Sequence, residues 1–412
     1  MSGISSRSVL RARSGRTWEA LFKKPPVQTR CLHSTPSRQV EIPSFDTTRA
    51  PLELKEALNT LRSKIILPSY LSPETQKMLF RPKHKKRIEA DPPTIEINDE
   101  VIQFAPMNRL KDLPAMKPLV NAAINNMKSA SDFQNLRPLL DGLRHAHRTL
   151  PEYMWTRMTR KAALANALPS IMTCVQHVDK THFKLNQSVT VNELLGYIQQ
   201  KAVDKEWGFP DLKRALGRTR MILELLETEL LHKRSPDEPG AVKYPSLHQD
   251  PQIQAARLHM AAAMAVRHYK GKDKGGLVEK YARELLTLWP RNKGLLTFYP
   301  KEAYENKMPM YYLTVPGNFT WYAAPVAHGL KLAAQVVPEL APQLLSRAKT
   351  VECEIKDEMR KHPLKARSRA MYDALFNPEK PLGAPKAPKP AEESAEESAE
   401  ESVEEPVKEP VA

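Results

Sequence analysis

Glycine and cysteine are scarce in this chain of 412 residues, which has 14 Gly and 3 Cys against 36 Pro. Nucleotide-binding and β-rich folds generally need glycine for tight turns and for close approach of the backbone to a ligand. The composition therefore favours a helical body with connections punctuated by proline. The cysteines, Cys31, Cys174 and Cys353, are too few and too scattered for a disulfide framework or a zinc site. They indicate a reducing environment.

Long apolar runs are also absent. A membrane span needs roughly 20 consecutive apolar residues, whereas the most apolar windows here, such as residues 258–266, are short and flanked by charge. The chain is 41% hydrophobic and 27% charged, which is enough to bury one large core or two smaller ones. We therefore expect a soluble protein with no membrane span.

Opposite charges are segregated along the chain, whose formal net charge is +16. Residues 1–39 carry +7, and residues 391–412 carry −8. Subtracting both from the total leaves +17 on residues 40–390. This basic body predicts a polyanionic partner, namely nucleic acid contacted directly or within a ribonucleoprotein. The alternative is a basic surface that is merely solvated.

Residues 1–39 have the composition of a mitochondrial transit peptide, because they are rich in Arg and Ser and contain a single acid, Glu19. A secretory signal would need a continuous apolar stretch of roughly 7 to 15 residues, which this segment lacks. Residues 30–35 resemble the matrix-processing pattern Arg-x-Leu/Phe-x-x-Ser/Thr, which places a first cut after Cys31. A second cut would remove eight further residues and leave Val40 as the new N-terminus. The alternative is a disordered basic arm that binds RNA. The residues that flank the two expected cuts are Cys31, Leu32, Gln39 and Val40.

Residues 40–112 are expected to form an extended, proline-rich basic arm with one helix over 52–66, where apolar residues recur at three-to-four spacing. Alternating apolar and polar residues over 94–104 also predict a short β-hairpin. The basic cluster 81–87 contains Pro82, so we expect it to be extended and to follow a phosphate backbone; the alternative is a solvated loop. The candidate RNA-contact residues are Arg81, Lys83, Lys85, Lys86 and Arg87.

Residues 113–376 are expected to form an α-helical body, since helical segments there alternate with proline, glycine or capping residues. The predicted fold class is therefore mainly α, a helical array. Two alternatives stay open: a degenerate helical repeat (TPR/PPR-like) and an irregular helical domain. Residues 377–412 form a Pro/Ala/Lys linker and a Glu-rich tail, which cannot bury enough apolar surface to fold. The segments with helical spacing are 119–127, 133–143, 151–167, 191–203, 210–232, 252–269, 277–288 and 340–361.

Residues 300–325 crowd six aromatic side chains among prolines. Aromatic rings can stack on unpaired RNA bases, but only Lys301 and Lys307 are close enough in the sequence to hold phosphates. We therefore expect these rings to pack inside the protein or against a protein partner.

The sequence contains no convincing catalytic constellation. The glycine-rich stretch 271–276 resembles a phosphate loop, but Leu277 stands where Lys-Ser/Thr should follow, and no strand is expected before it. Cys174 and His177 could approach each other on a helix, but a lone thiol of this kind is more often a small buried residue. We expect no enzyme activity, no cofactor, no metal and no small-molecule substrate.

The combination of an Arg/Ser presequence, a basic helical body and a low-complexity tail resembles the accessory proteins of the mitochondrial ribosome, of the lineage-specific kind seen in fungi. The most distinctive stretches are residues 61–73 and 281–290. The resemblance implies a non-catalytic ribosomal component in the mitochondrial matrix, bound to mitochondrial rRNA and to other mitochondrial ribosomal proteins. By analogy of fold, the small subunit is slightly favoured over the large. The alternative is a free RNA-binding factor, either a translational activator or an RNA-processing protein.

Overall fold

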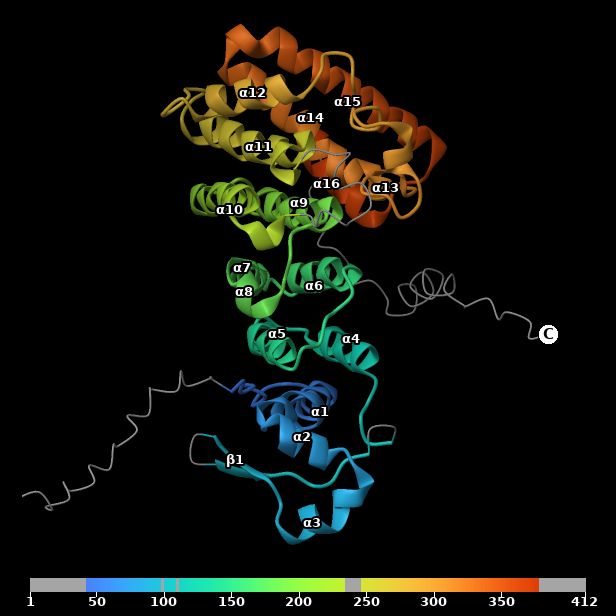
Figure 1. The fold of residues 1–412 in the computed structure, drawn as a ribbon. Helices are drawn as coiled ribbons and strands as arrows, with labels where there is room; N and C mark the ends of the chain where they lie inside the picture. Colours follow the sequence, from blue (N-terminus) through green and yellow to red (C-terminus); the bar gives the residue numbers. More distant parts are fainter. Residues whose placement is uncertain (1–41, 98–99, 109–110, 234–245, 378–412) are drawn as a thin grey trace, which may run out of the picture. The chain divides into compact units, whose positions relative to one another are not determined.

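The computed structural model describes residues 42–97, 100–108, 111–233 and 246–377. Nearly all regular structure in these ranges is helical (Figure 1), which confirms the predicted mainly α fold class. The predicted transit peptide with its four cleavage residues, and the tail from residue 378 onward, lie outside the described residues.

The predicted helix over 52–66 is confirmed. It consists of α1 (Leu52–Leu61) followed by a π-helical turn (Arg62–Ile66) and a 3-10 turn (Leu67–Tyr70). Leu54, Leu58 and Leu61 are fully buried on one side of this segment, as their three-to-four spacing requires.

The expectation of an otherwise extended arm is wrong for the segment that follows. α2 (Pro73–Leu79), a 3-10 turn (Pro82–His84) and α3 (Lys85–Ala90) occupy it instead. Its prolines begin these elements, because Pro73 and Pro82 each stand at a first position, where a helix needs no N–H donor. Ser72 caps α2 by accepting a hydrogen bond from the Thr75 N–H at 3.2 Å.

The predicted hairpin is confirmed. β1 (Thr94–Ile97) pairs antiparallel with β2 (Glu100–Gln103), with Thr94 opposite Gln103. A small core lies beside it, formed by five side chains from the segments on either side of the hairpin. These are Leu67, Leu71, Leu79, Phe104 and Met107.

From α1 to α11 the helices pack in series: α1 on α4, α6 on α9, α9 on α10, and α10 on α11. Packing of this kind is typical of helical arrays. The helices differ in length, from 4 residues in α8 to 20 in α10, so the array is not built of equal units. The bounds are α4 (Met116–Asn126), α5 (Leu136–His145), α6 (Tyr153–Leu164), α7 (Leu168–Gln176), α8 (Val178–Thr181), α9 (Ser188–Asp204), α10 (Phe209–Thr228) and α11 (Pro251–His268).

α14 (Phe319–Val336) is the central helix of the C-terminal part, where it packs against α11, α15 and α16 (Figure 1). No helix was expected over this range. Its residues are apolar on almost all sides and nearly all buried, so they show no single apolar stripe. The remaining helices are α12 (Leu277–Leu288), α13 (Tyr311–Thr314), α15 (Ala341–Lys361) and α16 (Ala366–Phe376).

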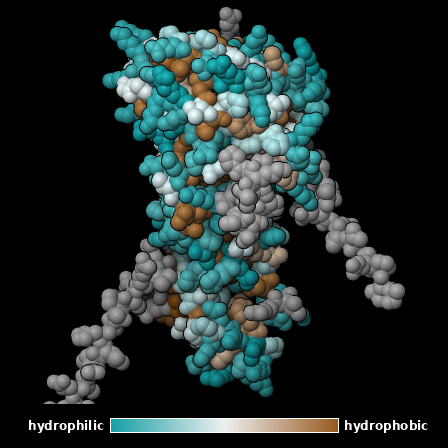
Figure 2. All heavy atoms as spheres, turned by 45° about the horizontal axis from the view of Figure 1, so that its top comes forward, coloured by the Kyte–Doolittle hydropathy of each residue, from teal (hydrophilic) through white to brown (hydrophobic). Residues whose placement is uncertain are grey.

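Four of the six aromatic side chains of segment 300–325 pack inside the protein, as expected, whereas Tyr311 is exposed. Tyr312, Phe319, Trp321 and Tyr322 are all buried. They belong to one large core that extends from Leu54 to Leu375. The face of the molecule in Figure 2 is accordingly mostly hydrophilic, with apolar residues gathered only in small patches.

Candidate RNA-contact surface

The five predicted RNA-contact residues lie together on the surface of the 3-10 turn and of α3. Arg81, Lys83, Lys85, Lys86 and Arg87 are all exposed. Ile88 is the buried residue of this helix, with 3% of its surface accessible, and it anchors the short helix to the body. The structure thus brings the cations together on a folded element rather than along an extended arm.

Little negative charge offsets these cations. Over residues 81–90 the five cations face one acid, Glu89, which leaves +4 with His84 neutral. Lys85 Nζ lies 3.8 Å from Glu89 Oε1, and both side chains are more than half exposed. Such a surface pair contributes less than about 1 kcal/mol, so Lys85 can exchange it for a phosphate.

This surface, defined by Arg81, Lys83, Lys85, Lys86 and Arg87, suits contact with a nucleic-acid backbone. Flexible cations spread over a short helix can neutralise several phosphates at once, which gives affinity with little base selection. No base-reading arrangement is evident among these residues, whose side chains are long, exposed and of one charge type.

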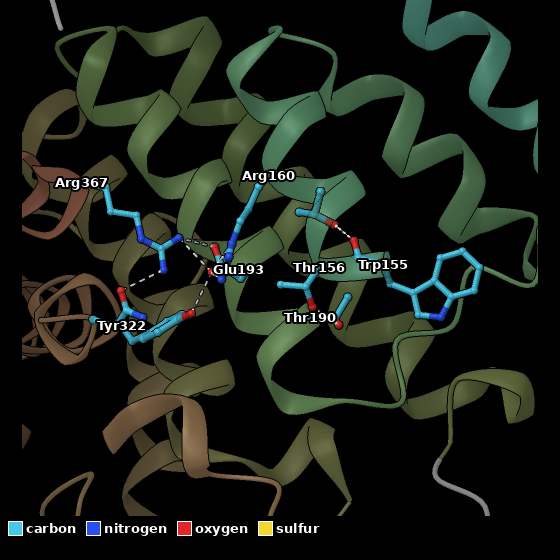
Figure 3. Close-up of polar contacts among 9 residues, drawn as sticks. Trp155, Thr156, Arg160, Thr190, Glu193, Tyr322 and Arg367 are labelled. Atoms are coloured by element: carbon cyan, nitrogen blue, oxygen red, sulfur yellow. Dashed lines mark hydrogen bonds and ion pairs between the residues drawn. The ribbon is translucent and has the colours of Figure 1, made fainter. Parts of the chain in front are cut away.

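A buried ion cluster that sequence reasoning missed joins α6, α9, α14 and α16 (Figure 3). Glu193 is fully buried. Its carboxylate accepts hydrogen bonds from Arg160 Nη2 at 2.7 Å, from Arg367 Nη1 at 2.9 Å and from the Tyr322 hydroxyl at 2.9 Å. The only signal in the sequence is an acid within the mostly apolar stretch 191–198. It indicates that the carboxylate needs a partner, but it does not identify that partner.

The electrostatics of this cluster are those of a structural ion pair. Burial alone would raise the pKa of Glu193, but Arg367 and Arg160 hold the pKa below its ordinary value. Burial, and then the charge of Glu193, raise the pKa of Tyr322. Glu193 is therefore ionised and fully engaged, and it cannot serve as a proton acceptor for a substrate.

A second buried polar cluster explains how the aromatic segment is held. The Tyr312 hydroxyl lies 2.9 Å from Ser188 Oγ and accepts from Gln252 Nε2 at 3.0 Å. The Tyr299 hydroxyl donates to Asp250 Oδ1 at 2.6 Å. These bonds fix the segment to the start of α9 and of α11, which is a packing role.

The stretch 271–276 is a turn between α11 and α12, so the element directly before it is a helix rather than a strand. Two of the first amides of α12 are occupied, because the Asp273 carboxylate accepts from the N–H groups of Val278 at 3.1 Å and Glu279 at 2.9 Å. An anion would have to displace Asp273 to bind these two amides.

Cys174 is buried, and burial raises the pKa of its thiol to about 12. A thiol of that pKa is a poor nucleophile at neutral pH. Within the ranges that the structure describes, no three His, Cys, Asp or Glu side chains gather as a metal site would require. None of the described helices combines the length and the apolar composition that crossing a membrane needs.

Comparison with known proteins gives the family. The family model of mitochondrial ribosomal protein mS27 matches residues 30–374. A relative from Neurospora crassa, the small ribosomal subunit protein mS27, is 38% identical over 374 residues, which cover 86% of this chain and 93% of the relative. The match includes the surface at 81–87 and the Glu193 cluster, and it confirms the resemblance to mitochondrial ribosomal proteins. The chain belongs to the mitochondrial ribosomal protein mS27 family.

Proposed function

We propose that the protein is a structural constituent of the small subunit of the mitochondrial ribosome, located in the matrix and acting in mitochondrial translation. The observation that carries this proposal is the 38% identity, over nearly the whole relative, to a protein named for the small ribosomal subunit. The fold agrees with it, because a helical array offers long surfaces to partners.

In this role the surface at 81–87 contacts mitochondrial rRNA, and other surfaces contact neighbouring ribosomal proteins. The exposure of all five cations and the single opposing acid support the RNA contact. The net charge of +17 on residues 40–390 supports it independently of the N-terminal arginines, which processing would remove.

Processing after Cys31 and then after Gln39 would make Val40 the mature N-terminus. The family match begins at residue 30, so the arginine-rich residues 1–29 precede the region shared with the family. Mass spectrometry of the N-terminal peptide from purified mitochondria tests the site. A mature peptide beginning upstream of Leu32 would overturn it.

Sedimentation tests the ribosomal assignment. A mitochondrial lysate is run through a density gradient at high salt, with magnesium retained, and the protein is located by immunoblotting. Co-migration with the small subunit is expected. Migration near the top of the gradient would overturn the ribosomal role, and migration with the large subunit would overturn the subunit assignment.

A further inference from the structure

A hollow of about 130 Å³ lies far along the chain from the surface at 81–87. It is lined by α5, by the segment that follows α5, by Trp155 of α6 and by the stretch after α8. Its apolar wall includes Leu140, Leu143 and Trp155. Four basic side chains also line it: Arg144, Arg148, His182 and Lys184.

The single acid that lines the hollow is already engaged. The carboxylate oxygens of Glu152 accept hydrogen bonds from Asn186 Nδ2, at 2.9 Å, and from Gln187 Nε2. Glu152 therefore offsets the basic side chains only in part.

The backbone sets the positions of two of these side chains, Arg144 and His182. Arg144 Nε donates to the carbonyl oxygen of Asp179 at 3.0 Å, which orients the guanidinium and leaves its other N–H donors for a ligand. His182 ends α8 in the left-handed conformation, with φ 56°. The chain turns there, so that residues on both sides of His182 line the hollow. Within the described ranges, no carboxylate forms an ion pair with Arg144, Arg148 or Lys184.

The cations are close enough to affect one another. Burial lowers the pKa of His182, and the charges of Arg144 and Lys184 lower it further. The fold thus holds like charges together at an electrostatic cost, which a bound anion would relieve.

We propose that this hollow binds one nucleotide of an RNA strand, with a phosphate held by Arg144, Arg148 and Lys184 and the nucleoside against the apolar wall. Arg144 and Arg148 are exposed, so a strand can reach them from solvent. A mixed apolar and cationic lining matches the two parts of a nucleotide. The inference adds a second RNA contact to the proposed function, and it does not depend on the surface at 81–87.

RNA binding by the full-length mature protein tests the site. The probe is a fluorescein-labelled ten-nucleotide oligouridylate, followed by fluorescence anisotropy at fixed salt. The double variant R148Q/K184Q should raise the Kd about tenfold, since it removes two phosphate contacts. The matched control K213Q/R220Q changes two exposed cations on α10 and should leave the Kd within about twofold. Equal Kd values for R148Q/K184Q and the control would overturn the proposal.

A second measurement follows binding to the wild-type protein. It tests the site even if R148Q/K184Q does not fold. Imidazole resonances of the wild-type protein are titrated with pH, with His182 assigned by H182Q, in the presence of the oligouridylate, inorganic phosphate or a decaglutamate peptide. RNA should raise the pKa of His182, because the phosphate offsets the two neighbouring cations. No change with RNA, or an equal change with decaglutamate, would overturn the RNA assignment.

The proposed function and the proposed RNA site in the hollow can be overturned independently of each other. If the protein sediments away from the small subunit, the proposed function falls, while the titration with RNA still decides the hollow. If R148Q/K184Q binds RNA as the control does, the hollow falls, while the sedimentation result stands.

Discussion

Glu193 of α9 and Arg367 of α16 lie 174 positions apart in the chain, and two hydrogen bonds of 2.9 and 3.0 Å join them in the interior. Arg160 of α6 also forms an ion pair with Glu193, and its side chain is 44% exposed. One carboxylate therefore ties the end of the array to its middle, across the large core. A buried charge of this kind is strongly destabilising once it is left unpaired.

Replacing Arg367 should consequently cost more stability than replacing Arg160. R367M leaves the buried Glu193 with Arg160 as its one cationic partner, beside the Tyr322 hydroxyl, and we expect a loss of about 3 kcal/mol in the free energy of unfolding. R160M removes a half-exposed partner and should cost about 1 kcal/mol. Urea denaturation followed by circular dichroism measures both. R369M, an exposed arginine on the same helix, is the control and should change little; an equal loss in R369M and R367M would contradict the role of the pair.

The buried histidines should make stability depend on pH. His259 Nε2 lies 2.9 Å from His328 Nδ1, and burial followed by Arg267 and Lys331 lowers the pKa of His328 to about 4. Burial and His328 lower the pKa of His259 as well. Trp207 and Phe376 also face His328.

Because the folded state resists protonation of His328, the unfolded chain binds more protons between the folded pKa and the ordinary value of 6.5. The stabilisation is therefore complete above pH 6.5 and is lost as the pH falls toward 4, by up to about 3 kcal/mol for His328. In H328Q this loss should be smaller, as measured by urea denaturation at a series of pH values. Parallel pH profiles for H328Q and the wild-type protein would contradict the assignment.

The sequence predicted most of the long helices but not α14, whose residues are mostly apolar. α10 was recognised because Leu212, Ala215 and Leu226 recur on one face. α14 was missed because nearly every side of it is covered by another helix, so its residues carry no periodic signal, and Pro325 within it reads as a break.

The candidate site was predicted in composition but not in conformation. The cations at 81–87 can be identified from charge alone. Pro82 predicts an extended segment, but it begins a 3-10 turn that leads into α3. The contacts of Glu193 with Arg160 and Arg367 could not be predicted, because they depend on how distant helices meet.

Replacing glycine with alanine should destabilise the protein at Gly329 and Gly196, where helices approach closely, and should stabilise it at Gly217, where space is open. A Cβ at Gly329 would lie 2.9 Å from the His259 Cα, so G329A must displace backbone and should cost about 2 kcal/mol or more. A Cβ at Gly196 would meet the Trp321 ring at 2.9 Å, with a loss of similar sign. G217A meets nothing within 4 Å on α10 and should stabilise the protein by up to about 1 kcal/mol. Thermal unfolding midpoints rank the three variants, and a stabilising G329A would contradict the packing of α11 on α14.

The surface at 81–87 should govern how RNA affinity depends on salt. The triple variant K83A/K85A/K86A removes three exposed cations without touching the buried Ile88, so the thermal midpoint should stay unchanged. If each lysine neutralises one phosphate, the slope of log K against log salt should become shallower by about 2 to 3, with weaker binding at every salt concentration.

The matched control is K301A/K307A/K349A, which removes three exposed lysines from other elements. Both triple variants lower the net charge by the same amount, so any effect of overall charge on association is common to them. A shallower slope in the first variant alone assigns the phosphate contacts to α3 and the turn before it. Equal slopes in the two variants would mean that RNA responds only to the net charge of the body, and the surface at 81–87 would lose its role.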